Sequence, residues 1–117
     1  MEYNFQETVQ GDTMLEVQFE LKDGTGAAID LTDYSILMHV RKKASAVSDL
    51  QMVFSTGAAG TILITAPATD GKFTIPEREI DLEPYDYVYD MKFTNTVTNV
   101  TRTYLSGEFP VIAAVTY

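Results

Sequence analysis

The chain has 117 residues, of which 45% are hydrophobic and 21% charged, and it contains no cysteine. This length suits one domain spanning residues 1–117, and this apolar content is typical of a folded chain rather than a disordered one. The formal net charge of −9 would repel the phosphates of a nucleic acid, and a chain without cysteine has no disulfide, thiolate nucleophile or zinc–thiolate site.

The N-terminal segment, residues 1–13, is acidic and alternating. It lacks the basic start and apolar centre of a signal peptide, and no apolar run approaches the roughly 20 residues that a membrane helix needs. We therefore expect a protein made in the cytoplasm, with no membrane contact. Because the segment alternates, we expect residues 2–9 to pair at a sheet edge, either within the domain or with a neighbouring subunit.

Two strands with one buried face are predicted in the first third of the chain. Apolar and polar residues alternate over residues 14–22, and glycines at 24 and 26 predict a tight turn after them. The same period returns over residues 34–42, and residues 44–50 are interpreted as a loop. The side chains expected on the buried faces are Leu15, Val17, Phe19, Leu21, Tyr34, Ile36, Met38 and Val40.

The rest of the chain predicts further strands at residues 51–55, 61–66, 71–77, 85–94, 100–106 and 107–117. The first two of these are expected to form a hairpin through the small-residue turn between them. Pro76 is expected to end its strand, and Ser106–Gly107 to separate the last two strands. Pro110 predicts an edge or a bulge, and Phe109, Val111, Ala113 and Val115 are expected to share one face.

Strands that recur about every 8 to 12 residues, with no amphipathic helix, predict an all-β fold. The favoured architecture is an antiparallel β-sandwich, for which the strand count leaves both Ig-like and jelly-roll topologies open. The spacing of Leu82, Pro84 and Tyr87 is that of a tyrosine corner, in which a tyrosine hydroxyl bonds the backbone a few residues upstream. We therefore predict an Ig-like sandwich with a tyrosine-corner-like turn. Its next strand would bury Tyr87, Tyr89, Met91 and Phe93.

Four residues are expected to contribute to a protein–protein interface. Tyr85 is an aromatic residue in the corner turn, where it should be partly exposed. Arg41 and Lys42 head the basic cluster that ends with Lys43; this cluster is interpreted as the solvated end of a strand, or as a group that pairs with an acidic neighbour. Tyr117 lies beyond the expected core. Interaction through loops and edges is favoured over a concave ligand pocket.

No residue is predicted to be catalytic, to bind a cofactor or to ligate a metal. His39 lies on the outward face of its strand without a second histidine or a nucleophile placed by a motif, so nucleophilic catalysis is not expected. Carboxylates could gather around calcium near the corner or near the first turn, but no calcium-loop motif accompanies them. The two groups are Asp81, Asp86 and Asp90, and Asp23, Asp30 and Asp33.

Five strings of the sequence form a set: GDT at 11–13, IDLTDYSILMHVRK at 29–42, GKFTI at 71–75, YDYVYDMKF at 85–93 and SGEFPVIAAVT at 106–116. They resemble the small Ig-like β-sandwich proteins encoded among the structural genes of tailed bacteriophages, and are similar to the N-terminal domain of phage baseplate upper proteins.

The resemblance implies a virion protein of the tail, baseplate or neck that contacts other virion proteins in a symmetric homo-oligomeric ring. The chain ends directly after the last of these strings, so we expect a stand-alone adaptor, stabiliser or decoration subunit. No nucleic acid, membrane, small-molecule substrate or cofactor is expected. The alternative is a bacterial surface or secreted Ig-like binding module, for which carbohydrate is the ligand considered.

Overall fold

The computed structural model describes residues 2–42, 50–57 and 60–113. Within these residues the regular structure is β, apart from the short 3-10 helix η2 (Ala68–Asp70). The strands are β1 (Thr8–Val9), β2 (Thr13–Met14), β3 (Val17–Glu20), β4 (Tyr34–Arg41), β5 (Leu50–Ser55), β6 (Leu63–Ile64), β7 (Lys72–Ile75), β8 (Arg78–Glu79), β9 (Tyr85–Asn95) and β10 (Thr101–Ile112).

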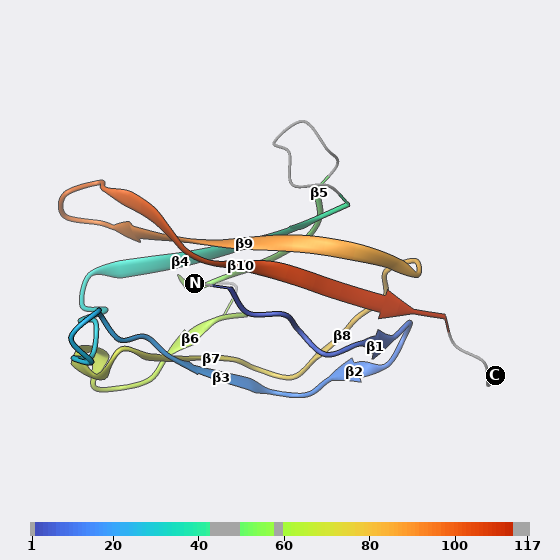
Figure 1. Cartoon of the computed structure of the whole chain (residues 1–117), viewed down its shortest axis with the longest axis horizontal. Coiled ribbons are helices and arrows are strands. Elements are labelled where there is room, and N and C mark those ends of the chain that lie inside the picture. The colour runs from blue at the N-terminus through green and yellow to red at the C-terminus, as the bar shows by residue number, and fades with distance from the viewer. Residues whose placement is uncertain (1, 43–49, 58–59, 114–117) are drawn as a thin grey trace.

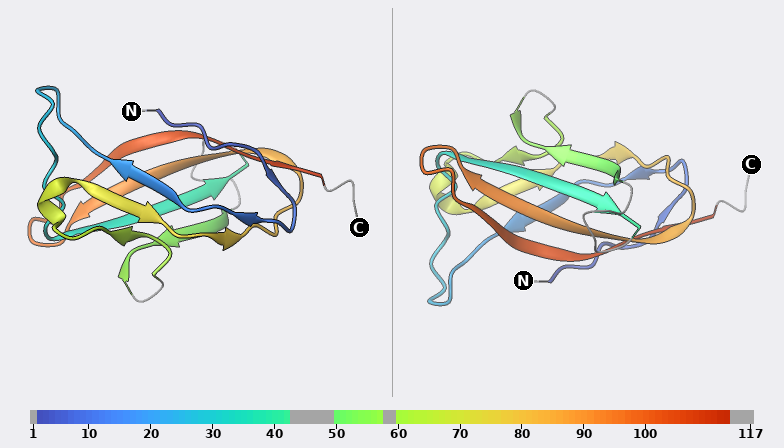
Figure 2. Two further views of the ribbon diagram at one scale, coloured as in Figure 1. Left: turned by 90° about the horizontal axis from the view of Figure 1, so that it is seen from below. Right: turned by 90° about the horizontal axis from the view of Figure 1, so that it is seen from above.

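The strands form two layers, an arrangement compatible with a β-sandwich (Figure 1). One layer is a five-stranded sheet in the order β1-β10-β9-β4-β5, and the other contains the pair β2-β8 and the sheet β3-β7-β6. Figure 2 shows this second layer from below and the large sheet from above, with the turn after β3 projecting beyond both. The all-β prediction is confirmed.

The core lies between the layers and follows the predicted alternation. On β4 and β9 every second side chain is buried, and the residues between them are more exposed. The buried residues form one hydrophobic cluster, which includes Ile36, Met38, Val40, Phe54, Phe73, Ile75, Tyr87, Tyr89, Met91, Phe93, Leu105 and Phe109. Strand β7 stops at Ile75, directly before Pro76, as predicted.

The N-terminal arm, residues 2–9, pairs at a sheet edge within its own domain. The backbone N–H of Tyr3 donates to the carbonyl of Ser106 and that of Phe5 to the carbonyl of Glu108, each at 3.0 Å. Further along, β1 runs parallel to β10. The arm therefore pairs within its own domain, which is the first of the two possibilities expected from the sequence. The sandwich is not wholly antiparallel as predicted, because β1 and β10 are parallel. The arm reaches the large sheet beside its last strand, which runs in the same direction.

The predicted break at Ser106–Gly107 is wrong, because β10 continues through both residues. Gly107 has a different role from a turn. A Cβ atom at this position would lie 2.1 Å from the backbone oxygen of Tyr3, far inside van der Waals contact. The glycine therefore lets the N-terminal arm approach the strand closely.

Pro110 lies inside β10, and the irregularity of that strand lies elsewhere, between Thr103 and Leu105. The carbonyl groups of Ser106, Glu108 and Ile112 accept hydrogen bonds from the N-terminal segment. The N–H and C=O groups of successive residues point to opposite sides of a strand. The N–H that Pro110 lacks would therefore point toward the N-terminal segment, on the same side as these three carbonyls. Pairing with β9 loses no donor.

The single strand predicted over residues 14–22 is interrupted. Strands β2 and β3 are separated by two residues, and Leu15, expected inside, is 74% exposed. Met14 is buried in its place. The alternation is valid for Val17 to Leu21, but the break after β2 shifts the inward parity by one residue.

The predicted hairpin of residues 51–55 and 61–66 is also wrong. Strand β5 pairs with β4, and β6 pairs with β7 in the other layer. The backbone N–H groups of Thr61 and Ile62 both donate to the carbonyl of Ser55, so the chain turns sharply and crosses between layers. Ile62 is buried at this crossing. Leu50 already belongs to β5, and the rest of the predicted loop, residues 44–49, lies outside the described residues.

The last strand buries fewer residues than predicted. Phe109 and Val111 face the core as expected, but Ala113 lies beyond the end of β10 and is exposed. Val115 lies outside the described residues, so its expected position on the same face stays a prediction.

Candidate interaction surface

The turn before β9 is held by a tyrosine hydroxyl. Tyr87 is fully buried, and its hydroxyl donates to the backbone carbonyl of Glu83 at 2.6 Å. Burial raises the pKa of the Tyr87 hydroxyl. Because Tyr87 also packs in the core, the hydrogen bond ties the turn to the body of the sheet.

Two predicted interface residues meet beside this turn. The ammonium of Lys42 lies 3.2 Å from a carboxylate oxygen of Glu83 and 5.2 Å from the centre of the Tyr85 ring. Its hydrogen bond with Glu83 is the main cause of the raised pKa of Lys42. The Tyr85 ring packs at 5.4 Å against the ring of Tyr87, yet 43% of the residue is exposed, as predicted.

Arg41 precedes Lys42 at the end of β4, where its register partners are Leu50 on β5 and Val88 on β9. We call Arg41, Lys42, Glu83 and Tyr85 the corner patch. The structure places Lys42 and Tyr85 in contact, with Arg41 next to Lys42 in the chain, whereas Tyr117 and Lys43 lie outside the described residues. Glu83 was not predicted. It gives Lys42 an acidic partner in the same chain, where the sequence predicted a solvated group or one paired with a neighbour.

Two of the carboxylates considered for calcium, Asp23 and Asp30, instead stabilise turns. Asp23 accepts hydrogen bonds from the backbone N–H and hydroxyl of Thr25 and from the N–H of Ala27, and these bonds, the Thr25 hydroxyl first, lower the pKa of Asp23. Asp30 accepts from the N–H of Thr32. Among residues 2–42, 50–57 and 60–113 no three potential ligands gather in one place. His39 faces outward with Asp90 as its register partner on β9.

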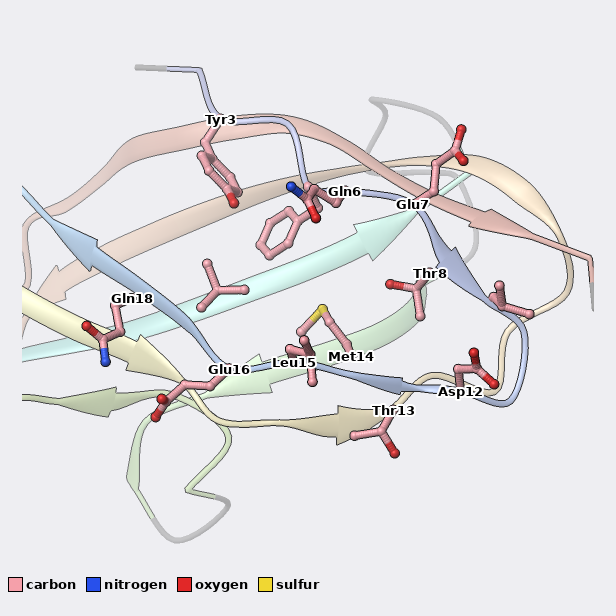
Figure 3. Close-up of a pocket in the computed structure, with 13 residues that line it drawn as sticks. Tyr3, Gln6, Glu7, Thr8, Asp12, Thr13, Met14, Leu15, Glu16 and Gln18 are labelled. Carbon is pink, nitrogen blue, oxygen red and sulfur yellow. The ribbon is translucent and has the colours of Figure 1, made fainter.

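A second surface feature lies between the N-terminal arm and the β2–β3 segment (Figure 3). It is an open groove of about 510 Å³, which we call the edge groove. Its lining residues are Tyr3, Phe5, Gln6, Glu7, Thr8, Val9, Asp12, Thr13, Met14, Leu15, Glu16, Val17 and Gln18. Sequence reasoning missed it, because a groove between two segments depends on where each segment pairs.

The inner end of the edge groove is closed by aromatic rings. Phe5 is 5% exposed, and its ring lies 4.9 Å from Tyr89 and 5.0 Å from Phe109. The Tyr3 ring packs edge-on against Phe5 and Phe19, which belong to different layers. The hydroxyl of Tyr89 donates to the backbone carbonyl of Tyr3. These contacts bind the arm to both sheets.

A scan against protein-family models and a search of curated proteins each found no match to the chain. In the part of the chain that the structure describes, no helix combines the length and apolar character needed to cross a membrane.

Proposed function

We propose that the chain is a structural protein of a tailed bacteriophage virion, located in the tail, baseplate or neck. It acts through contacts with other virion proteins as an adaptor, stabiliser or decoration subunit, after synthesis in the host cytoplasm. Support comes from the resemblance of its strand sequences and, above all, from the corner patch. There the partly exposed ring of Tyr85 lies beside the ammonium of Lys42, and Arg41 precedes Lys42 at the end of β4.

The corner patch has the composition of a binding surface. Tyrosine and arginine supply much of the binding energy at protein interfaces, because they bury a large area and still make polar contacts. The whole chain carries a net charge of −9, so Arg41 and Lys42 stand out as basic groups. In a ring of identical copies Arg41, together with the Lys42–Glu83 pair, would meet the surface of the next copy and set its register.

The finer fold proposal is an Ig-like sandwich with a tyrosine corner at Leu82, Pro84 and Tyr87, which the hydrogen bond from Tyr87 to Glu83 supports. Tyr87→Phe should lower the free energy of unfolding by about 1 to 3 kcal/mol, because the part-buried hydrogen bond to the Glu83 carbonyl is lost. Urea denaturation measures this. Tyr104→Phe is the matched control, expected to change stability by less than about 0.5 kcal/mol. If both variants and the wild type unfolded at the same urea concentration, the tyrosine-corner proposal would be wrong.

Assembly tests the virion proposal. Purified protein is expected to form a closed oligomer or to enter phage particles, with the corner patch buried in an electron-microscopy map. Tyr85→Ala should weaken assembly by about tenfold or more, the loss of an interface anchor. Val97→Ala, in an exposed loop, is the matched control and should assemble normally. A protein that stays monomeric and is absent from particles would contradict the proposal.

The second candidate is a bacterial surface or secreted Ig-like binding module. The edge groove favours it, because tyrosine, glutamine and carboxylate side chains line an open hollow of about 510 Å³. Calorimetric titration with a panel of neutral oligosaccharides would decide. Saturable heat that is lost in Tyr3→Ala would support this candidate in place of the virion role.

A further inference from the structure

The edge groove separates two sheet edges beside which the described part of the chain places no further strand. Strand β3 ends the sheet β3-β7-β6, and the N-terminal arm with β1 ends the large sheet. Such edges present unpaired backbone groups that can accept an added strand. Side chains of both edges line the groove, including Gln6 and Thr8 from the arm side and Glu16 and Gln18 from the β3 side (Figure 3).

The direction of the free backbone groups on β3 follows from its pairing with β7. The N–H of Leu21 donates to the carbonyl of Gly71, and the register pairs Phe19 with Phe73. Because backbone groups alternate in direction along a strand, those of Gln18 and Glu20 point away from β7. They are the groups that an incoming strand would bond.

The side chains around the edge groove select the charge of an occupant. Glu7, Asp12 and Glu16 line it, and among the residues that the structure describes no lysine or arginine does so. Within the described residues none of these three carboxylates makes a salt bridge. Leu15 adds an apolar contact, with 74% of the residue exposed. An extended segment with apolar and basic residues complements this lining.

We propose that the free edge of β3 and the edge groove bind an extended segment of a partner protein in which basic and apolar residues alternate. Successive side chains of a strand point to opposite faces, so apolar ones can contact Leu15 and Tyr3 while basic ones reach the carboxylates. A second copy of this chain is a poor occupant, because its charge of −9 repels the groove. The inference rests on the proposed role in protein contacts and adds a surface built from residues outside the corner patch.

The test uses two synthetic peptides and the full chain. The first is a capped heptapeptide of alternating lysine and valine, and the second carries N-methyl groups on every other peptide nitrogen, which removes backbone donors but keeps the charge. Binding is followed by amide NMR shifts. The first peptide should bind at least about tenfold more tightly, with shifts at residues 15–20 and in the arm, because two or so backbone hydrogen bonds are lost in the second.

Charge is tested with matched triple variants. Glu7→Gln with Asp12→Asn and Glu16→Gln should weaken binding of the first peptide by about tenfold and reduce its salt dependence. The control removes three carboxylates from the outer face of the large sheet, through Asp86→Asn, Asp90→Asn and Glu108→Gln, and should bind nearly as wild type.

Four results would overturn the proposal. They are equal affinity for the two peptides, shifts spread over the whole acidic surface, no saturable binding at millimolar peptide, and dimers of the free protein that bury the β3 edge. If the first peptide fails to bind but the protein still enters particles, this inference fails and the proposed function stands. If the first peptide binds but the protein never assembles, the proposed function fails and this inference stands.

Discussion

The two outer edges of the large sheet, β5 and the N-terminal arm, are protected in different ways. At β5 a guanidinium nitrogen of Arg78 donates to the carbonyl of Val53 at 2.9 Å, and the guanidinium lies 4.7 Å from the centre of the Phe54 ring. The hydroxyl of Thr61 accepts from the backbone N–H of Ser55. At the arm, by contrast, closure depends on aromatic packing.

This difference shows that closing a core and protecting an edge are separate requirements. The β5 edge has both, since polar groups from the second layer bond its backbone and cover its aromatic ring. At the arm side, Phe5 and Tyr3 exclude water from the core, but among residues 2–42, 50–57 and 60–113 no strand lies beside the outward backbone groups of β3. The arm side is therefore the side available for strand addition.

The strongest way to break the comparison is to remove the arm's anchor. Phe5→Ala should lower the free energy of unfolding by about 3 to 5 kcal/mol, since a buried aromatic side chain leaves a cavity among Phe19, Tyr89 and Phe109. Urea unfolding gives the value. Leu50→Ala, at the exposed start of β5, is the comparison and should cost far less. Similar losses for both would show that the arm does not close the core.

Gly107→Ala tests the close approach of the arm to β10. The added methyl would clash with the backbone of Tyr3, so the variant should lose about 1 to 3 kcal/mol of stability and release the arm. Proton-exchange NMR should then show loss of protection at Tyr3 and Phe5. Gly24→Ala, where a Cβ meets open space, should change stability by less than about 0.5 kcal/mol. A protected arm in Gly107→Ala would contradict the close-approach role.

Arg78→Met tests the polar closure of β5. Methionine keeps an apolar cover over Phe54 but cannot donate to Val53, so we expect a loss of about 1.5 kcal/mol. The β5 edge should also begin to bind the alternating lysine–valine peptide. Arg102→Met, at an exposed position on β10, is the control. Unchanged stability and no new peptide binding in Arg78→Met would leave β5 protected by some other means.

The smallest effect is expected from Tyr89→Phe, which removes the donor to Tyr3 and should cost about 1 kcal/mol at pH 7. Burial raises the pKa of the Tyr89 hydroxyl above its usual range. Its contribution is therefore complete below the unfolded pKa of about 10 and is lost as pH rises toward the folded value. Urea midpoints at pH 8 and 11 should show the gap between wild type and variant narrowing. A gap that widens at pH 11 would contradict this role.

The local sequence pattern was enough to predict which side chains face the core, where one strand ends and how one turn is held. Alternation over β4 and β9 indicated which side chains face the core, because a strand with one wet face needs that period whatever it pairs with. Pro76 marked the end of β7, and the spacing before Tyr87 indicated a hydroxyl bonded to upstream backbone, which the contact with Glu83 now supplies. In the candidate surface, the exposure of Tyr85 was predicted in the same way.

Tertiary structure alone decided which strands pair and which residues meet across the chain. The sequence predicted Gly107 as a turn residue. A glycine is needed there because the backbone of Tyr3, about a hundred positions away, lies too close for a Cβ atom, and this contact cannot be seen in the local sequence. The alternation predicted Leu15 in the core, but the break after β2 shifts the inward-facing positions by one residue, and Leu15 is exposed. The sequence also predicted a hairpin of β5 and β6, which belong to different layers. The salt bridge of Lys42 with Glu83 and the pairing of the arm with β10 both link segments that are far apart in the sequence, so no local pattern indicated them. Periodicity reports one strand's two faces, whereas pairing is chosen by the packing of the whole core.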